Sequence, residues 1–75
     1  MTSSTKKRLT EFFDVDKLPL TPVDFARIMS EIVEKYEDDE EVCHVVMDDL
    51  MMRQLSALGY DDGVCVFEYT PRWYA

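Results

Sequence analysis

The chain has 75 residues, 47% of them hydrophobic, and a formal net charge of −8 from 16 acidic and 8 basic residues. This length allows one small domain, and the hydrophobic fraction is typical of a folded protein, which excludes wholesale disorder. The negative charge repels phosphate groups, so we expect neither direct nucleic-acid binding nor attachment to a membrane surface.

The N-terminal segment 1–8 is small, polar and basic, and we expect it to be disordered, followed by a single small helical domain over 9–75. No apolar stretch like that of a secretory signal opens the chain, and no apolar run is long enough to span a membrane. Two cysteines are too few for a disulfide framework. These features predict a protein of the reducing cytoplasm.

A short helical turn is expected over 8–14, where Leu9, Phe12 and Phe13 can pack against the rest of the domain. Residues 17–20 contain a proline and are predicted to form an extended connector.

The first long helix is predicted over 21–37. Thr21 is a suitable N-cap, Pro22 fits the first helical position, and Asp24 stands where a capping-box acid lies. Its apolar residues recur at helical spacing and define one buried face. They are Phe25, Ile28, Met29, Ile32 and Tyr36.

Five consecutive acidic residues, 37–41, separate this helix from a second one predicted over 39–58. Asp38 or Asp39 is expected to cap the second helix, and Gly59 is expected to end it in a left-handed conformation. So short a connection requires two antiparallel helices. The face toward the first helix is predicted to hold Cys43, Val46, Met47, Leu50, Met51 and Leu58.

The segment 61–75 is compatible with a strand over 64–70 or with a short third helix. A lone strand has no partner in this chain, which favours the helix. Trp73 and Tyr74 are expected to fold back across the hairpin. The predicted fold is therefore mainly α: an antiparallel helical hairpin with a short N-terminal turn and an aromatic C-terminal segment packed across it.

Three apolar residues of the second helix, Val42, Val45 and Met52, fall on the arc opposite the first helix. Either the C-terminal segment with Phe67, Trp73 and Tyr74 covers them, or another protein chain does. In the second case the arc is a partner-binding surface with a charged rim. The residues of that candidate surface are Val42, Val45, Met52, Glu41, Asp48 and Asp49.

No motif completes a metal or catalytic site. Asp14 and Asp16 begin a spacing similar to a calcium-binding EF-hand loop, but the glycine position holds Pro19 and the last carboxylate position holds Phe25. We therefore expect the acidic residues before the first long helix to form a turn.

Cys43 and His44 are the closest approach to a nucleophile and base, or to the start of a zinc site. Neighbouring helical residues point about 100° apart, so these two cannot share a proton directly. A zinc ion held with Cys65 and a carboxylate is the alternative, but we interpret both thiols as small core residues. We expect no enzymatic activity, catalytic residue, cofactor or metal ion.

The segment Leu58-Gly59-Tyr60-Asp61-Asp62-Gly63-Val64-Cys65-Val66-Phe67-Glu68, with Trp73-Tyr74-Ala75 at the end, carries a resemblance. It is similar to a group of small uncharacterised proteins of tailed bacteriophages and prophages that share the pattern L-G-Y-x-x-G-V-x-x-F-E followed by W-Y-A. The resemblance covers roughly 21–75. It implies a phage origin and a host or phage macromolecule as the target, and it assigns no catalytic residue.

We expect a phage-type accessory protein of the bacterial cytoplasm that binds and inhibits a host protein, such as a defence or transcription component. One alternative is a self-assembling or small-ligand-binding helical module that forms a homo-oligomer. A second is a nucleic-acid mimic whose acidic residues occupy a basic groove. The run 37–41 either contributes to such binding or serves only solubility.

Overall fold

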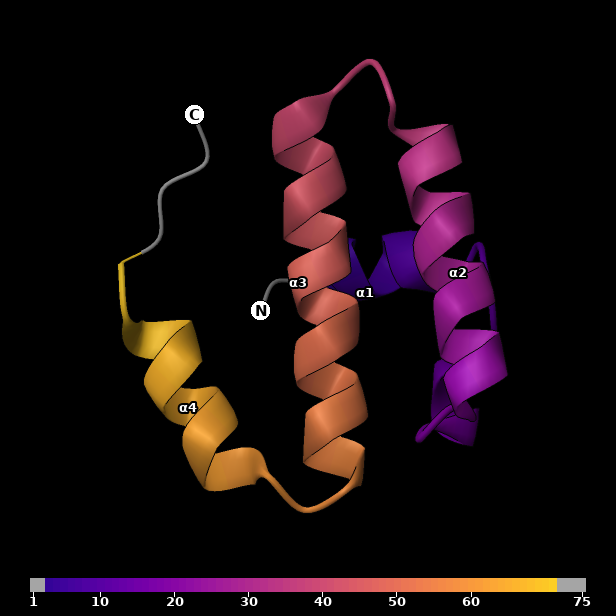
Figure 1. Ribbon diagram of the computed structural model, residues 1–75. Helices are drawn as coiled ribbons and strands as arrows, with labels where there is room; N and C mark the ends of the chain where they lie inside the picture. The colour runs from indigo at the N-terminus through magenta and orange to yellow at the C-terminus, as the bar shows by residue number, and fades with distance from the viewer. Residues whose placement is uncertain (1–2, 72–75) are drawn as a thin grey trace.

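The computed structural model describes residues 3–71, with side-chain surroundings from Lys6 onward. Its elements are α1 (Ser3–Leu9), the 3-10 turn η1 (Val15–Lys17), α2 (Pro22–Lys35), α3 (Glu40–Ala57) and α4 (Asp61–Tyr69). Figure 1 shows α2 and α3 as an antiparallel pair, with α1 crossing behind α3 and α4 on the side of α3 away from α2. The predicted mainly helical fold is confirmed, and residues 3–71 contain no strand.

Helix α2 begins as the sequence predicts. The Thr21 hydroxyl accepts a hydrogen bond of 3.2 Å from the backbone N–H of Asp24, and Pro22 occupies the first turn. The predicted apolar face is also correct, because Ile28 and Ile32 are completely buried.

Helix α3 has the predicted cap at each end. The Asp39 side chain accepts a hydrogen bond of 3.1 Å from the N–H of Val42. At the other end Gly59 has a φ of +95°, and the N–H of Tyr60 donates to the Leu55 carbonyl at 3.0 Å. This geometry satisfies carbonyls that the end of a helix leaves without partners, and only glycine adopts it without strain.

The core lies where α1, α2 and α3 meet. It consists of Leu9, Ile28, Ile32, Cys43, Val46 and Leu50. Several half-buried side chains of the connecting segments pack against it, among them Phe12, Phe13, Leu18 and Leu20. The connector between α1 and α2 is thus part of the domain's interior.

The N-terminal prediction requires a correction. A disordered segment was expected over 1–8, whereas the structure has a helix from Ser3, and residues 1–2 lie outside the described part. Tertiary contacts account for the difference, because an isolated helix of this length is unstable in water. Leu9 is completely buried, and the Arg8 guanidinium lies 5.6 Å from the ring centre of Tyr36.

Two polar contacts fix the connector to the hairpin. The Gln54 side chain accepts a hydrogen bond of 2.7 Å from the Leu20 N–H and donates one of 2.9 Å to the Leu20 carbonyl. The Lys35 ammonium donates to the Glu11 carboxylate at 2.7 Å. All three hydrogen bonds join residues that are far apart in the sequence.

The C-terminal segment is helical, as favoured over a strand. Helix α4 has Tyr60 at its N-cap position without a side-chain cap, and Asp61 and Asp62 lie in its first turn. These two carboxylates are stabilised by the positive end of the helix dipole. Trp73 and Tyr74, expected to fold across the hairpin, lie outside the described residues.

Between residues 3 and 71, no helix is both long and apolar enough to cross a membrane.

Candidate functional site

The six residues of the predicted partner-binding surface do not form an exposed apolar arc. Glu41 is exposed, Val42, Val45 and Asp48 are half-buried, Met52 is buried, and Asp49 is 0% exposed. Asp49 was expected at a charged rim, and the structure places it in the interior instead.

The packing around α3 explains this difference. Helix α3 contacts α1, α2 and α4, so apolar residues on several of its sides are covered within the chain. Val42 packs against the core, and Met52 lies beside Val64 and Phe67 of α4. For Met52, the described structure therefore favours coverage by the chain's own C-terminal segment.

Asp49 is the single buried charged residue among those described. Its Oδ1 accepts a hydrogen bond of 2.9 Å from Arg53 Nε, one turn further along α3. Its Oδ2 is also buried and has no hydrogen-bond partner in the described part of the chain. Burial raises the pKa of the Asp49 carboxyl above its ordinary value of 3.8, and the bond to Arg53 opposes this shift without cancelling it.

Asp49 lines a cavity of about 560 Å³ between η1, α3 and α4, hereafter the Asp49 cavity. Its other polar walls are Arg53, Ser56 and Glu68. Its apolar walls are Val15, Leu18, Met52, Ala57 and Val64. The cavity thus combines a partly unsatisfied carboxylate with aliphatic surface.

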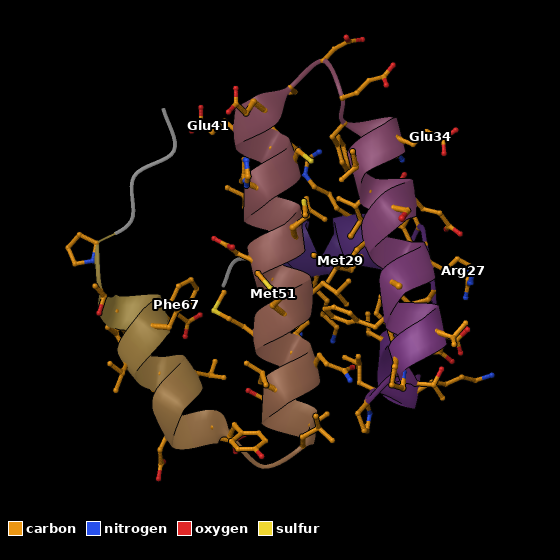
Figure 2. All side chains as sticks on the ribbon, viewed as in Figure 1. Arg27, Met29, Glu34, Glu41, Met51 and Phe67 are labelled. Atoms are coloured by element: carbon orange, nitrogen blue, oxygen red, sulfur yellow. The ribbon has the colours of Figure 1, made fainter. Side chains whose placement is uncertain are left out.

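A second hollow, hereafter the α3–α4 groove, has about 420 Å³ and is almost entirely apolar. It is lined by Met51, Met52, Leu55, Tyr60, Gly63, Val64 and Phe67. Figure 2 shows Met51 on the side of α3 that faces the viewer and Phe67 on α4, directed toward α3. Among the residues that the structure describes, no charged side chain lines this groove.

A third hollow of about 320 Å³ adjoins the groove. It is formed by Leu20, Pro22, Phe25, Met51, Gln54 and Leu55. Met51 and Leu55 line both hollows, so together they form a ridge between two apolar depressions. A continuous apolar surface therefore runs from the start of α2 over α3 to α4.

Sequence reasoning assigned part of this surface incorrectly. Met51 and Leu58 were expected to face α2 in the core, but both are exposed, as are Tyr60 and Phe67. The available signal was the spread of apolar residues around α3, which indicates contacts on several sides but does not say which sides stay open. The predicted surface and the observed groove share only Met52.

The metal and thiol predictions can be compared with the geometry. Residues 3–71 contain no group of three His, Cys, Asp or Glu side chains able to hold a metal ion. Cys43 is buried, as expected, and its thiol lies 3.6 Å from the Met47 sulfur. Cys65 was interpreted as a core residue, but it is exposed and lines neither of the two hollows beside α4.

Comparison with known proteins supplies no relative on which to base an assignment: no protein-family model matches the chain, and neither a curated protein nor a solved structure does.

Proposed function

We propose that this protein is a binding module that uses the α3–α4 groove to hold an apolar segment of a partner protein. One observation carries the proposal. Tyr60, Gly63, Val64 and Phe67 are fixed letters of the pattern L-G-Y-x-x-G-V-x-x-F-E, and all four line the groove. Four of the seven fixed letters of the pattern that carries the resemblance therefore line this surface.

The chemistry of the surface supports a protein partner. Contiguous exposed apolar surface on a small protein marks an interaction site. The large exposed apolar residues that line this surface are Met51, Leu55, Tyr60 and Phe67. Asp61 and Asp62 lie at one end of the groove, and the whole chain is strongly acidic. A segment with apolar residues flanked by lysine or arginine is complementary to this arrangement.

The biological role that we propose is that of a phage accessory protein that binds and inhibits a host protein. The support is the resemblance of 21–75 to small phage proteins, together with the small size and acidic surface. Bacterial lysate is therefore the appropriate source of partners.

A matched pair of double variants tests the groove. Met51→Glu with Phe67→Glu places two charges inside it, whereas Val23→Glu with Val33→Glu places two charges on the exposed side of α2. Both pairs add the same charge, and all four positions are exposed, so we expect both to fold with similar melting temperatures. The partner captured from lysate by the parent chain should bind the α2 variant and not the groove variant.

Two results would contradict the proposal. Equal capture of the same partner by both variants would place the binding surface elsewhere. Capture by both variants that is lost at high salt would indicate that charge alone governs binding, as expected for a nucleic-acid mimic.

The same apolar surface favours self-association as a second candidate function. Two copies that meet through the groove would bury the exposed side chains of α4. Sedimentation equilibrium decides between the candidates: a monomer that captures a partner supports the first, and a dimer that the groove variant abolishes supports the second.

A further inference from the structure

The Asp49 carboxylate is satisfied on one side only. Arg53 Nε donates to Oδ1, while Oδ2 is buried without a partner among the described residues. An unsatisfied acceptor that is removed from water costs about 1–3 kcal/mol, and more when it is charged. Such an atom in the wall of a cavity indicates where a hydrogen-bond donor would bind most favourably.

The remaining walls restrict what that donor can be. A calcium ion requires six to eight oxygen ligands, and among the described residues two carboxylates, Asp49 and Glu68, line the cavity. A guanidinium group binds best when it bridges both oxygens of a carboxylate, but Arg53 already occupies Oδ1. A single ammonium group needs only Oδ2.

We propose that the Asp49 cavity binds an alkylammonium group, with the ammonium on Asp49 Oδ2 and the alkyl chain against the aliphatic wall. That wall, formed by Val15, Leu18, Met52 and Val64, would bury the methylene groups, each of which contributes about 0.8 kcal/mol when fully removed from water. This site lies beside η1; it shares Met52 and Val64 with the groove but does not include Tyr60 or Phe67. An ammonium group on Asp49 does not require a partner in the groove, so the proposal goes beyond the proposed function.

Access to the carboxylate requires a side chain to move. Asp49 is fully buried, while the Arg53 side chain is 28% exposed on a flexible stem. We expect Arg53 to shift toward solvent as the ammonium enters while it retains its bond to Oδ1.

The test is a titration of the full chain with n-butylammonium chloride, followed through backbone amide NMR signals. The controls are n-butanol, which has the same alkyl chain without the charge, and sodium chloride at equal ionic strength. Saturable shifts at Val15, Leu18, Asp49 and Val64 with the amine alone are the expected result. No saturable shift, or equal shifts with n-butanol, would overturn the proposal.

Two variants separate the carboxylate from the cavity. Asp49→Asn removes the charge at nearly unchanged volume and should weaken n-butylammonium binding at least tenfold. Ser56→Phe fills the cavity without touching the carboxylate and should have the same effect, which keeps the test decisive if the Asp49 variant does not fold. Undiminished binding in either folded variant would refute the site.

A second probe distinguishes a free amine from a lysine side chain of another protein. Nα-acetyl-lysine methylamide carries the same ammonium group on a peptide backbone. If it shifts the same signals as n-butylammonium, the cavity accepts lysine from a protein. If only n-butylammonium does so, the site is specific for small amines. Both patterns support an alkylammonium site, and binding of neither overturns it.

Discussion

Asp49 is a residue whose predicted and observed environments differ: the sequence predicts an exposed side chain, and the structure buries it. On a helical wheel it belongs to a polar arc, yet in the fold it is completely buried beside Arg53. A buried ion pair contributes little net stability, because the cost of removing two charges from water offsets their attraction. Net stability alone therefore does not account for an acid at this position.

The raised pKa of Asp49 gives the first prediction. A carboxyl whose pKa is higher in the folded than in the unfolded state holds its proton more tightly when folded. Its contribution to the free energy of unfolding therefore falls as the pH rises from about the unfolded value of 3.8 through the raised folded value. Asn cannot titrate, so the parent should lose stability relative to Asp49→Asn over this range.

Urea unfolding of both proteins from acid to about pH 7 measures this difference. A parent that gains stability relative to the variant as the pH rises would show that Arg53 lowers the pKa more than burial raises it. Glu68→Gln, across the cavity, is the companion variant, because Glu68 also raises the Asp49 pKa and its loss should reduce the effect.

Gln54 is a second residue whose role depends on the tertiary structure. Its amide satisfies both backbone groups of Leu20, which lies 34 positions earlier. Gln54→Leu retains the apolar contacts and removes both hydrogen bonds, so we expect a loss of about 1–3 kcal/mol in the free energy of unfolding. Gln54→Glu keeps one acceptor and loses the donor, and an intermediate loss is expected. If both variants have the same free energy of unfolding as the parent, water replaces the hydrogen bonds of the Gln54 amide without loss of stability.

At the scale of elements, the two glycines at the ends of α3 and α4 differ in backbone conformation and in how they would tolerate a side chain. Gly59 ends α3 with a φ of +95°, which other residues rarely adopt. Gly63 lies in the first turn of α4, and a Cβ built on it meets no atom within 4 Å. A methyl group at this position would therefore clash with nothing and would project into free space beside the groove that Gly63 lines.

This contrast predicts substitutions of opposite sign. Gly59→Ala should destabilise the protein by about 1–2 kcal/mol, because alanine is strained in a left-handed conformation. Gly63→Ala should stabilise it by about 0.5–1 kcal/mol, as alanine does inside a helix, while its methyl group narrows the groove and weakens partner binding. Thermal unfolding measures the stability change of each variant. Two changes of the same sign would contradict the different conformations assigned to the two glycines.

Helix α4 is less deeply packed than α1, α2 and α3, each of which contains at least one fully buried residue. It has no fully buried residue, and only Val64 and Glu68 are half-buried. We therefore expect its backbone amides to exchange with deuterium faster than those of α3 around Leu50. Exchange at equal rates would mean that α4 opens only when the whole domain unfolds. Slower exchange of α4 after the partner is added would support the groove as its binding site.

At the scale of the whole molecule, three helices share one small core. Leu9 is as completely buried as Leu50, although it belongs to the segment closest to the N-terminus. We predict that Leu9→Ala and Leu50→Ala each cost about 2–5 kcal/mol, a large part of the total stability of a small domain. Val23→Ala, at a residue 78% exposed, is the control and should change little. If urea unfolding shows Leu9→Ala to resemble this control, α1 is not part of the core.

The sequence by itself determined the features that depend on near neighbours along the chain. The caps at Thr21 and Asp39, the left-handed Gly59 and the buried face of α2 all follow from interactions within about four residues. They were sufficient to predict the helical hairpin and its antiparallel order.

Only the tertiary structure decided what surrounds α3. Its apolar residues are spread around the helix, so their periodicity does not select one buried face. Which of them are covered depends on how α1 crosses and where α4 lies (Figure 1). Those positions follow from contacts such as Leu9 in the core and Gln54 on Leu20, which join distant parts of the chain. For that reason Asp49 is buried and the α3–α4 groove is open, and no local pattern indicated either.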